Sequence, residues 1–168
     1  MKKAVVVGVV FLFAFGVRGQ VAGRASLPGH GGVPAEVLKA KPCCSRRASN
    51  AGVRLELTGI YIDSSLLWLV FRGVNRSAID FRAGRMRFVI RDRHALKRRA
   101  LQELRLVPLV RQEETTVWAD SAVTLYYGLT PRVPGKRQEL VIEWAERNGD
   151  RRMLIRVAAR DLLTARRL

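Results

Sequence analysis

The residues best suited to chemistry are few in this sequence, and their spacing is not that of a catalytic group. Asp92 and His94 flank Arg93 and could orient one another, but no serine lies in a nucleophile elbow that they would complete. The chain has no phosphate-binding loop and no glycine-rich dinucleotide turn. The chain has only two histidines, His30 and His94, so no zinc or haem spacing is present. We therefore expect no enzymatic activity, no metal and no cofactor.

Two adjacent cysteines, Cys43 and Cys44, are the only thiols in the chain. Neighbouring Cα atoms lie about 3.8 Å apart, below the usual disulfide separation, so a bridge between them would be strained. In an oxidising compartment they could pair with another chain, and Arg46 and Arg47 would favour their thiolate forms. The simpler interpretation is two incidental thiols in a loose segment.

Arginines alternate along two segments that are expected to be strands. These arginines are Arg85, Arg87 and Arg91 in the first segment and Arg152 and Arg156 in the second. Such alternation would place a basic row on one face of a sheet, which could bind nucleic-acid phosphates. Trp68, Phe88 and Trp144 are expected to be buried, so they would not stack on bases. A solvated face, or a surface for an acidic partner protein, is the favoured interpretation.

The elements that must position these residues fit in one domain with appendages, because the chain has 168 residues. A composition of 48% hydrophobic and 27% charged residues is typical of a folded protein. Lys and Arg total 31 against 14 Asp and Glu, which gives a net charge of +17. This excess points to nucleic acid, anionic lipid or acidic proteins as partners.

The N-terminal region predicts export. A cationic start at Lys2 and Lys3 precedes an apolar stretch over 4–17, so we expect a cleaved secretory signal over 1–19. The stretch is too short for a typical membrane span, and no later segment is expected to span a membrane. Glycine and proline then dominate 20–52, which predicts a flexible arm, with one helical turn over 35–40.

From Val53 onward the hydrophobic period becomes two, which is typical of strands with one buried face. The strands expected from this pattern cover 53–62, 66–74, 85–91, 117–129, 139–144 and 151–158. The stretch 97–105 fits either one face of a helix or an edge strand, and the edge strand is favoured. We expect 66–74 to be central because both of its faces are apolar. Asn148-Gly149 indicates a two-residue hairpin turn, and Asp161 could cap a terminal helical turn.

About seven short strands and no long helix predict an all-β fold over 53–168. The expected architecture is an antiparallel, immunoglobulin-like β-sandwich, with a small barrel as the alternative. A sandwich with a free edge would bind partners by strand addition or through one sheet face.

Short motifs in this region resemble the C-terminal domain of the Bacteroides-type conjugative transposon protein TraN family. The motifs are Leu57-Thr58-Gly59-Ile60-Tyr61, Leu66-Leu67-Trp68, Asn75-Arg76-Ser77-Ala78-Ile79-Asp80-Phe81, Arg87-Phe88-Val89-Ile90-Arg91-Asp92, Lys97-Arg98-Arg99-Ala100-Leu101-Gln102-Glu103, Pro108-Leu109, Leu140-Val141-Ile142-Glu143, Glu146-Arg147-Asn148-Gly149-Asp150-Arg151 and Asp161-Leu162-Leu163-Thr164-Ala165. Their order and spacing agree with the family, and none is a catalytic signature. Longer relatives carry a further β-rich domain where this chain has only the arm.

The resemblance implies a non-enzymatic, exported scaffold component of a conjugative type IV secretion apparatus. It implies a periplasmic, outer-membrane-associated location. The implied partners are other transfer proteins of the cell envelope, with a small lipoprotein as one candidate. An exported nucleic-acid-binding protein is the alternative that the net charge suggests.

Seven positions within these motifs are candidates for fold or contact roles: Gly59, Tyr61, Asn75, Asp80, Arg98, Gln102 and Glu103. Asn75 and Asp80 are expected to cap a crossover turn. Arg98 and Glu103 are expected to pair on the edge strand.

Overall fold

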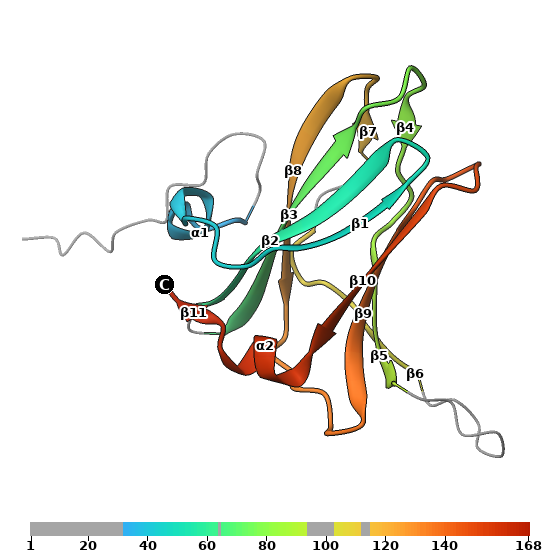
Figure 1. Cartoon of the computed structure of the whole chain (residues 1–168). Helices are drawn as coiled ribbons and strands as arrows, with labels where there is room; N and C mark the ends of the chain where they lie inside the picture. Colours follow the sequence, from blue (N-terminus) through green and yellow to red (C-terminus); the bar gives the residue numbers. More distant parts are fainter. Residues whose placement is uncertain (1–31, 64, 94–102, 112–114) are drawn as a thin grey trace, which may run out of the picture.

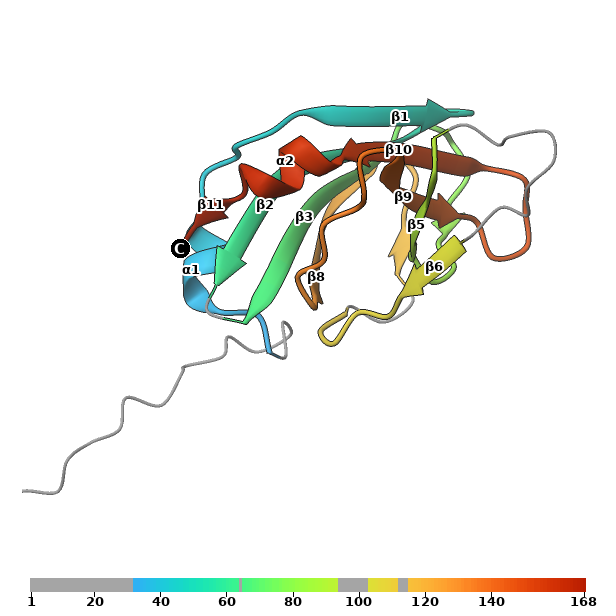
Figure 2. The same cartoon turned by 90° about the horizontal axis from the view of Figure 1, so that it is seen from below.

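The computed structural model describes residues 32–63, 65–93, 103–111 and 115–168. In this part of the chain two β-sheets pack face to face around an apolar core (Figure 1). Sheet 1 has the strand order β1-β2-β3-β8, with β11 beside β2, and sheet 2 has the order β10-β9-β5-β6. Figure 2 shows the two layers from below, with α1 beside the β2 end of sheet 1. The all-β sandwich expected from the sequence is confirmed.

The two sheets contain more strands than the seven expected. Sheet 1 consists of β1 Arg46–Asn50, β2 Val53–Asp63, β3 Leu66–Asn75, β8 Ser121–Leu129 and β11 Arg166–Arg167. Sheet 2 consists of β5 Arg87–Asp92, β6 Glu103–Leu106, β9 Gln138–Ala145 and β10 Arg152–Ala158. The remaining elements are a short strand pair, β4 Phe81–Arg82 and β7 Thr116–Val117, and the helices α1 Ala35–Lys39 and α2 Ala159–Leu163. Neighbouring strands are antiparallel except β11, which runs parallel to β2.

Alternating side chains of the facing strands form the main core. On β2 the inward residues Val53, Leu55 and Leu57 are fully buried, while the residues between them are partly exposed. Phe71 of β3 meets Phe88 of β5 across the layers, with ring centroids 6.4 Å apart. This contact joins the two sheets, and it follows directly from the period of two in the sequence.

A second, smaller core covers the outer face of sheet 1. Val37 of α1 and Val33, which precedes Pro34, pack with Tyr61, Trp68 and Val70. Tyr61 and Trp68 are directly opposite each other in the β2–β3 ladder. The helix therefore explains why β3 is apolar on both faces: one face meets sheet 2 and the other meets α1.

The expectation of an arm without strands over 20–52 is wrong for its described part. β1 pairs antiparallel with β2 through a two-residue turn at Ala51 and Gly52, whose φ angles are +44° and +80°. Positive φ at both central residues is the type I′ geometry that suits the twist of a hairpin. The sequence signal was weak because alanine rarely occupies the first of these positions. The domain thus begins well before Val53.

The outer edge of β2 is covered along its length by segments from both ends of the described chain. β1 pairs with residues 53–57, and β11 pairs with Tyr61 and Ile62. Between them lies a β-bulge after Leu57, where the carbonyl of Thr58 accepts from the backbone N–H groups of Cys43 (3.0 Å) and Cys44 (3.3 Å). This edge is therefore occupied by the chain itself, which protects it from adding a foreign strand.

The single strand expected over 117–129 is in fact two strands in different sheets. β7 ends at Val117 and pairs with β4, whereas β8 begins at Ser121 and pairs with β3. The intervening turn includes Asp120 at a φ of +51°, a left-handed conformation that aspartate tolerates better than most residues. The edge strand expected within 97–105 is β6, and residues 94–102 lie outside the described residues.

The hairpin expected at Asn148-Gly149 is confirmed, but the prediction that its turn has two residues is wrong. β9 and β10 pair from Ala145 opposite Arg152, so six residues connect them. Gly149 does not adopt a positive φ. A Cβ at Gly149 would instead lie 2.7 Å from Cδ of Glu146, so this glycine leaves room for a folded-back carboxylate.

The terminal helix is α2, and Asp161 lies inside it rather than before it. Its Oδ2 accepts from the backbone N–H of Ala158 (3.1 Å) and from Nη2 of Arg46 on β1 (2.6 Å). Asp161 thus caps the start of the helix, as the sequence predicts, and also connects α2 to β1.

The two sides of the sandwich differ. On one side β1 contacts β10, and Nδ2 of Asn50 donates to the carbonyl of Arg152 (3.3 Å). On the other side the last strands are β6 of sheet 2 and β8 of sheet 1, and a pocket lies between the sheets there. Two separate sheets with this open side correspond to a sandwich and not to the barrel alternative.

Candidate functional site

Asn75 is a buried polar residue at the end of β3, and it organises the crossover from sheet 1 to sheet 2. Its Nδ2 donates to the carbonyls of Ile79 (2.8 Å) and Val117 (3.1 Å). Its Oδ1 accepts from the backbone N–H of Ser77 (3.0 Å) and from the Ser77 hydroxyl (2.7 Å). The full set of partners offsets the burial of this amide. The expectation that Asn75 caps the crossover turn is met in its geometry.

Asp80 fixes the next part of the same crossover. Its Oδ1 accepts from the backbone N–H of Ala119 at 2.9 Å, in the turn between β7 and β8. The loop 76–80 and the turn 118–120, far apart in the chain, are therefore held together by Asn75 and Asp80.

Arg151, which is not among the positions predicted from the sequence, completes this arrangement. Its Nη2 donates to the carbonyl of Asp80 (2.7 Å) and its Nη1 to the Ser77 hydroxyl (3.2 Å). Its Nε donates to Oε2 of Glu146 (2.8 Å), and its Nη2 also pairs with Oε1 of that residue. We name the set Asn75, Ser77, Asp80, Glu146 and Arg151 the Asn75 network. The signal that could have found Arg151 is the pair of opposite charges flanking Asn148-Gly149.

The electrostatics of the Asn75 network favour its charged forms. The hydrogen bonds and charge of Arg151 lower the pKa of Glu146, and the hydrogen bond to Glu146 raises the pKa of Arg151. The guanidinium carbon of Arg151 also lies 5.3 Å from the centroid of the Phe81 ring. Both side chains are mostly buried, so this pair is a fixed part of the fold and not a free acid or base.

The Asn75 network presents two exposed apolar side chains at one end of the sandwich. Ile79 lies in the loop that Asn75 holds and is 70% exposed. Trp118 lies in the turn that Asp80 holds and is 64% exposed. Large apolar side chains on a rigid support are typical of contact surfaces between proteins. We name Ile79 and Trp118 the apolar end.

Gly59 and Tyr61 lie together, away from Asn75. The ring of Tyr61 lies across Gly59, and a Cβ at Gly59 would be 2.6 Å from Cζ of the ring. The hydroxyl of Tyr61 donates to the carbonyl of Lys41 (2.7 Å), which ties the segment after α1 to sheet 1. Burial raises the pKa of Tyr61 to about 12, with Cys43 contributing in the same direction. These two positions support the fold.

The third group of candidate positions lies at the edge of sheet 2. Glu103 is exposed at the start of β6, directly opposite Arg91 of β5 in the ladder. Arg98 and Gln102 lie outside the described residues, as does His94, so the expected pairing of Arg98 with Glu103 stays a prediction.

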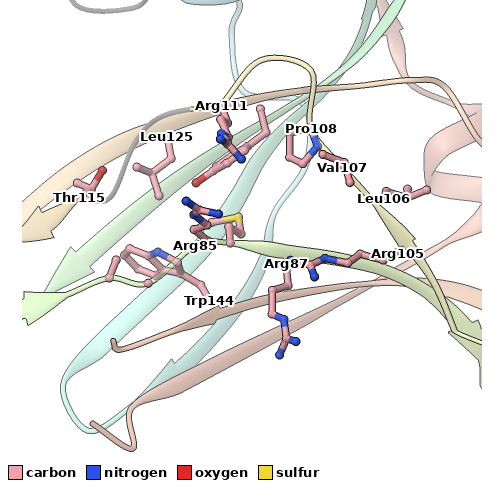
Figure 3. Close-up of a pocket in the computed structure, with 14 residues that line it drawn as sticks. Arg85, Arg87, Arg105, Leu106, Val107, Pro108, Arg111, Thr115, Leu125 and Trp144 are labelled. Carbon is pink, nitrogen blue, oxygen red and sulfur yellow. The ribbon is translucent and has the colours of Figure 1, made fainter. Parts of the chain in front are cut away.

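The pocket on the open side of the sandwich is lined by arginines. It has a volume of about 490 Å³ and lies between β5 and β6 of sheet 2 and β8 of sheet 1 (Figure 3). Among the described residues, its lining includes Arg85, Arg87, Arg105 and Arg111, and no aspartate or glutamate. Its apolar wall comes from residues that belong to the main core, among them Met86, Leu125, Tyr127 and Trp144. We name it the arginine pocket.

The side chains of the arginines that line this pocket point in different directions. In Figure 3, Arg85 and Arg111 reach into the opening from opposite sides, whereas Arg87 points away from it. Arg87 instead pairs with Glu143 on the outer face of sheet 2 (3.8 Å). Burial raises the pKa of Tyr127, another lining residue, to about 12, and the positive charge of Arg111 opposes this shift.

The basic row expected on one sheet face exists, but glutamates interrupt it. Arg152 pairs with Glu143 (2.9 Å) and Arg156 pairs with Glu139 (3.5 Å) on the outer face of sheet 2. The ladder places these glutamates on β9, between the arginines of β5 and those of β10. Part of the positive charge on this face is therefore neutralised within the sheet.

Trp68, Phe88 and Trp144 are buried, as predicted, so none of them offers a stacking surface. Within the described ranges, no group of three or more His, Cys, Asp or Glu side chains is placed to hold a metal ion. The described helices are also too short or too polar to cross a membrane.

The family model described as "Domain of unknown function (DUF4138)" matches residues 35–167. The chain belongs to this family. No curated protein matches the chain.

The limits of the DUF4138 domain coincide with elements of the structure. The match begins at Ala35, the first residue of α1, and ends at Arg167, the last residue of β11. The DUF4138 domain therefore includes α1 and β1, which the sequence analysis assigned to an arm, and the expected domain start at 53 is too late.

The cysteines belong to the DUF4138 domain as well. Both are free thiols, and Sγ of Cys44 lies 3.4 Å from the carbonyl of Leu57. Burial, with Cys43 contributing in the same direction, raises the pKa of Cys44 to about 12. The expectation that nearby arginines favour its thiolate is therefore wrong, because the loss of solvation outweighs the attraction of Arg46.

Proposed function

We propose that this chain is a non-enzymatic, exported structural component of a conjugative type IV secretion apparatus, acting by contacts with other proteins. The observation that carries the proposal is the ordered series of motifs from Gly59 to Ala165 that resembles the TraN C-terminal domain. The DUF4138 match supports a single domain over this span, and the finer assignment to the TraN family is part of the proposal. The signal pattern over 1–19 supports a periplasmic location.

The way the structure uses these motifs supports a contact role. The polar residues of the 75–81 and 146–151 motifs satisfy one another in the Asn75 network, so they hold a surface in place. That surface is the apolar end, where Ile79 and Trp118 are exposed. In this proposal the apolar end docks onto another envelope protein of the apparatus.

Co-purification tests this function. The tagged full chain, expressed in cells that carry the conjugative element, is expected to recover envelope transfer proteins. Replacing both residues of the apolar end, Ile79→Asp with Trp118→Asp, is expected to abolish that recovery. Leu163→Asp is the matched control, because Leu163 is equally exposed (69%) but lies on α2. Recovery of the wild-type chain as a free monomer contradicts the proposal.

A second candidate function is nucleic-acid binding, which the net charge of +17 favours. It predicts affinity for single-stranded DNA that falls steeply between low and physiological salt, because bound phosphates release counterions. Absence of DNA binding at low salt eliminates this candidate.

A further inference from the structure

We infer that the arginine pocket binds an extended acidic segment of a partner protein through its carboxylates. This inference concerns a different surface from the apolar end. It does not depend on the assignment to a transfer apparatus.

The described lining of the arginine pocket is strongly positive. Four arginines line the pocket, and no carboxylate is among the lining residues that the structure describes. Arg87 has Glu143 as a partner outside the pocket. No carboxylate in the described part of the chain pairs with Arg85 or Arg111, which face each other across the opening in Figure 3. Guanidinium groups held at one opening repel each other, so an anion between them is stabilised, and a carboxylate matches their planar geometry.

The open side of the sandwich places the edge of a strand beside the pocket. β6 is the last strand of sheet 2, and it pairs only with β5 within the described residues. Arg105 and Leu106 of β6 line the pocket directly. A strand edge beside a pocket can take up an extended peptide by main-chain hydrogen bonds, with alternate side chains entering the pocket.

The lining of the arginine pocket suits a peptide better than a nucleic acid. The rings within the pocket, Tyr127 and Trp144, are 6% and 1% exposed, so they form a wall and cannot stack on bases. Val107 lies at the rim and is 67% exposed, which provides an apolar contact beside the arginines. An alternation of acidic and apolar side chains fits this combination better than a row of phosphates.

Fluorescence anisotropy with the purified full chain tests the inference. The probe is a short labelled peptide in which glutamate alternates with valine, and the comparison peptide has glutamine in place of each glutamate. We expect the acidic peptide to bind at low ionic strength and the glutamine peptide to bind at least about tenfold more weakly.

Matched variants locate the binding site. Arg85→Gln with Arg111→Gln is expected to weaken acidic-peptide binding by about tenfold. Arg132→Gln with Arg137→Gln removes the same charge from an exposed loop before β9 and is expected to change binding less than about twofold. All four arginines are exposed, and an unchanged thermal midpoint confirms that the variants fold.

Three outcomes overturn the inference. The first is no binding of the acidic peptide at low salt. The second is an equal loss of affinity in the loop control, which would assign binding to net charge alone. The third is a single-stranded oligonucleotide that binds more tightly than the peptide and loses affinity in the Arg85 and Arg111 variant, which would assign the pocket to phosphates.

Discussion

Arg151 and Glu146 hold each other by side chain and by backbone across the β9–β10 connection. Nε of Arg151 donates to Oε2 of Glu146 at 2.8 Å, and the backbone N–H of Glu146 donates to the carbonyl of Arg151 at 2.9 Å. The same guanidinium reaches the carbonyl of Asp80. A hairpin of sheet 2 is thereby fastened to the crossover that leaves sheet 1, so the position of the apolar end depends on this pair.

Replacing Arg151 by methionine should destabilise the domain by about 2–3 kcal/mol. The change leaves the carboxylate of Glu146 and the carbonyl of Asp80 without their donor in a mostly buried site. The free energy of unfolding in urea measures the effect. Arg132→Met, at an exposed loop position, should change it by less than about 0.5 kcal/mol. Equal effects of the two substitutions would show that the Asn75 network contributes nothing specific.

The pH dependence of stability should carry the signature of Glu146. Arg151 lowers the pKa of this carboxyl in the folded state below its ordinary value of 4.5. Its contribution is therefore fully present above pH 4.5 and is lost as the pH falls through the lower, folded-state pKa. Glu146→Gln should be less stable than the wild type at pH 7, and the difference should shrink on acidification toward pH 3. A difference that stays constant with pH would contradict this assignment.

The sequence predicted the elements that depend on a simple alternation, and it missed those that depend on distant partners. β2, β9 and β10 follow from the period of two, and β3 follows from a short run that is apolar on both faces. β1 and β11 contain exposed arginines without apolar alternation, and they form strands because the edge of β2 is available to them. Such pairing is a property of the assembled sheet.

The candidate site shows the same division. Asn75 and Asp80 are turn residues, so their local capping chemistry was readable from their types and spacing. Arg151 acts on a loop far back in the chain, and the arginine pocket combines residues from both sheets. The opposite charges flanking Asn148-Gly149 are a local signal for the pairing of Arg151 with Glu146. The hydrogen bond of Arg151 to Asp80 and the arginine pocket have no local pattern, because they arise only when the two sheets pack against each other.

The two cysteines should react at different rates with an alkylating reagent. Cys43 is exposed, whereas burial raises the pKa of Cys44 to about 12 and leaves little thiolate at pH 8. Brief iodoacetamide treatment of the native chain, followed by mass spectrometry of peptides, should find Cys43 labelled and Cys44 largely unlabelled. Treatment in urea should label both, which serves as the control. Equal labelling of the native chain would contradict the packing of Cys44 against β2.

The contact between Gly59 and Tyr61 can be measured by a double-mutant cycle. Gly59→Ala should destabilise the domain by about 2 kcal/mol, because the new Cβ meets a ring held by its hydrogen bond to Lys41. In a Tyr61→Leu background the ring is absent, so the same substitution should destabilise by less than about 1 kcal/mol. Urea unfolding of the four proteins gives the coupling. If Gly59→Ala has the same effect in both backgrounds, the glycine is required by its backbone and not by the ring that lies across it.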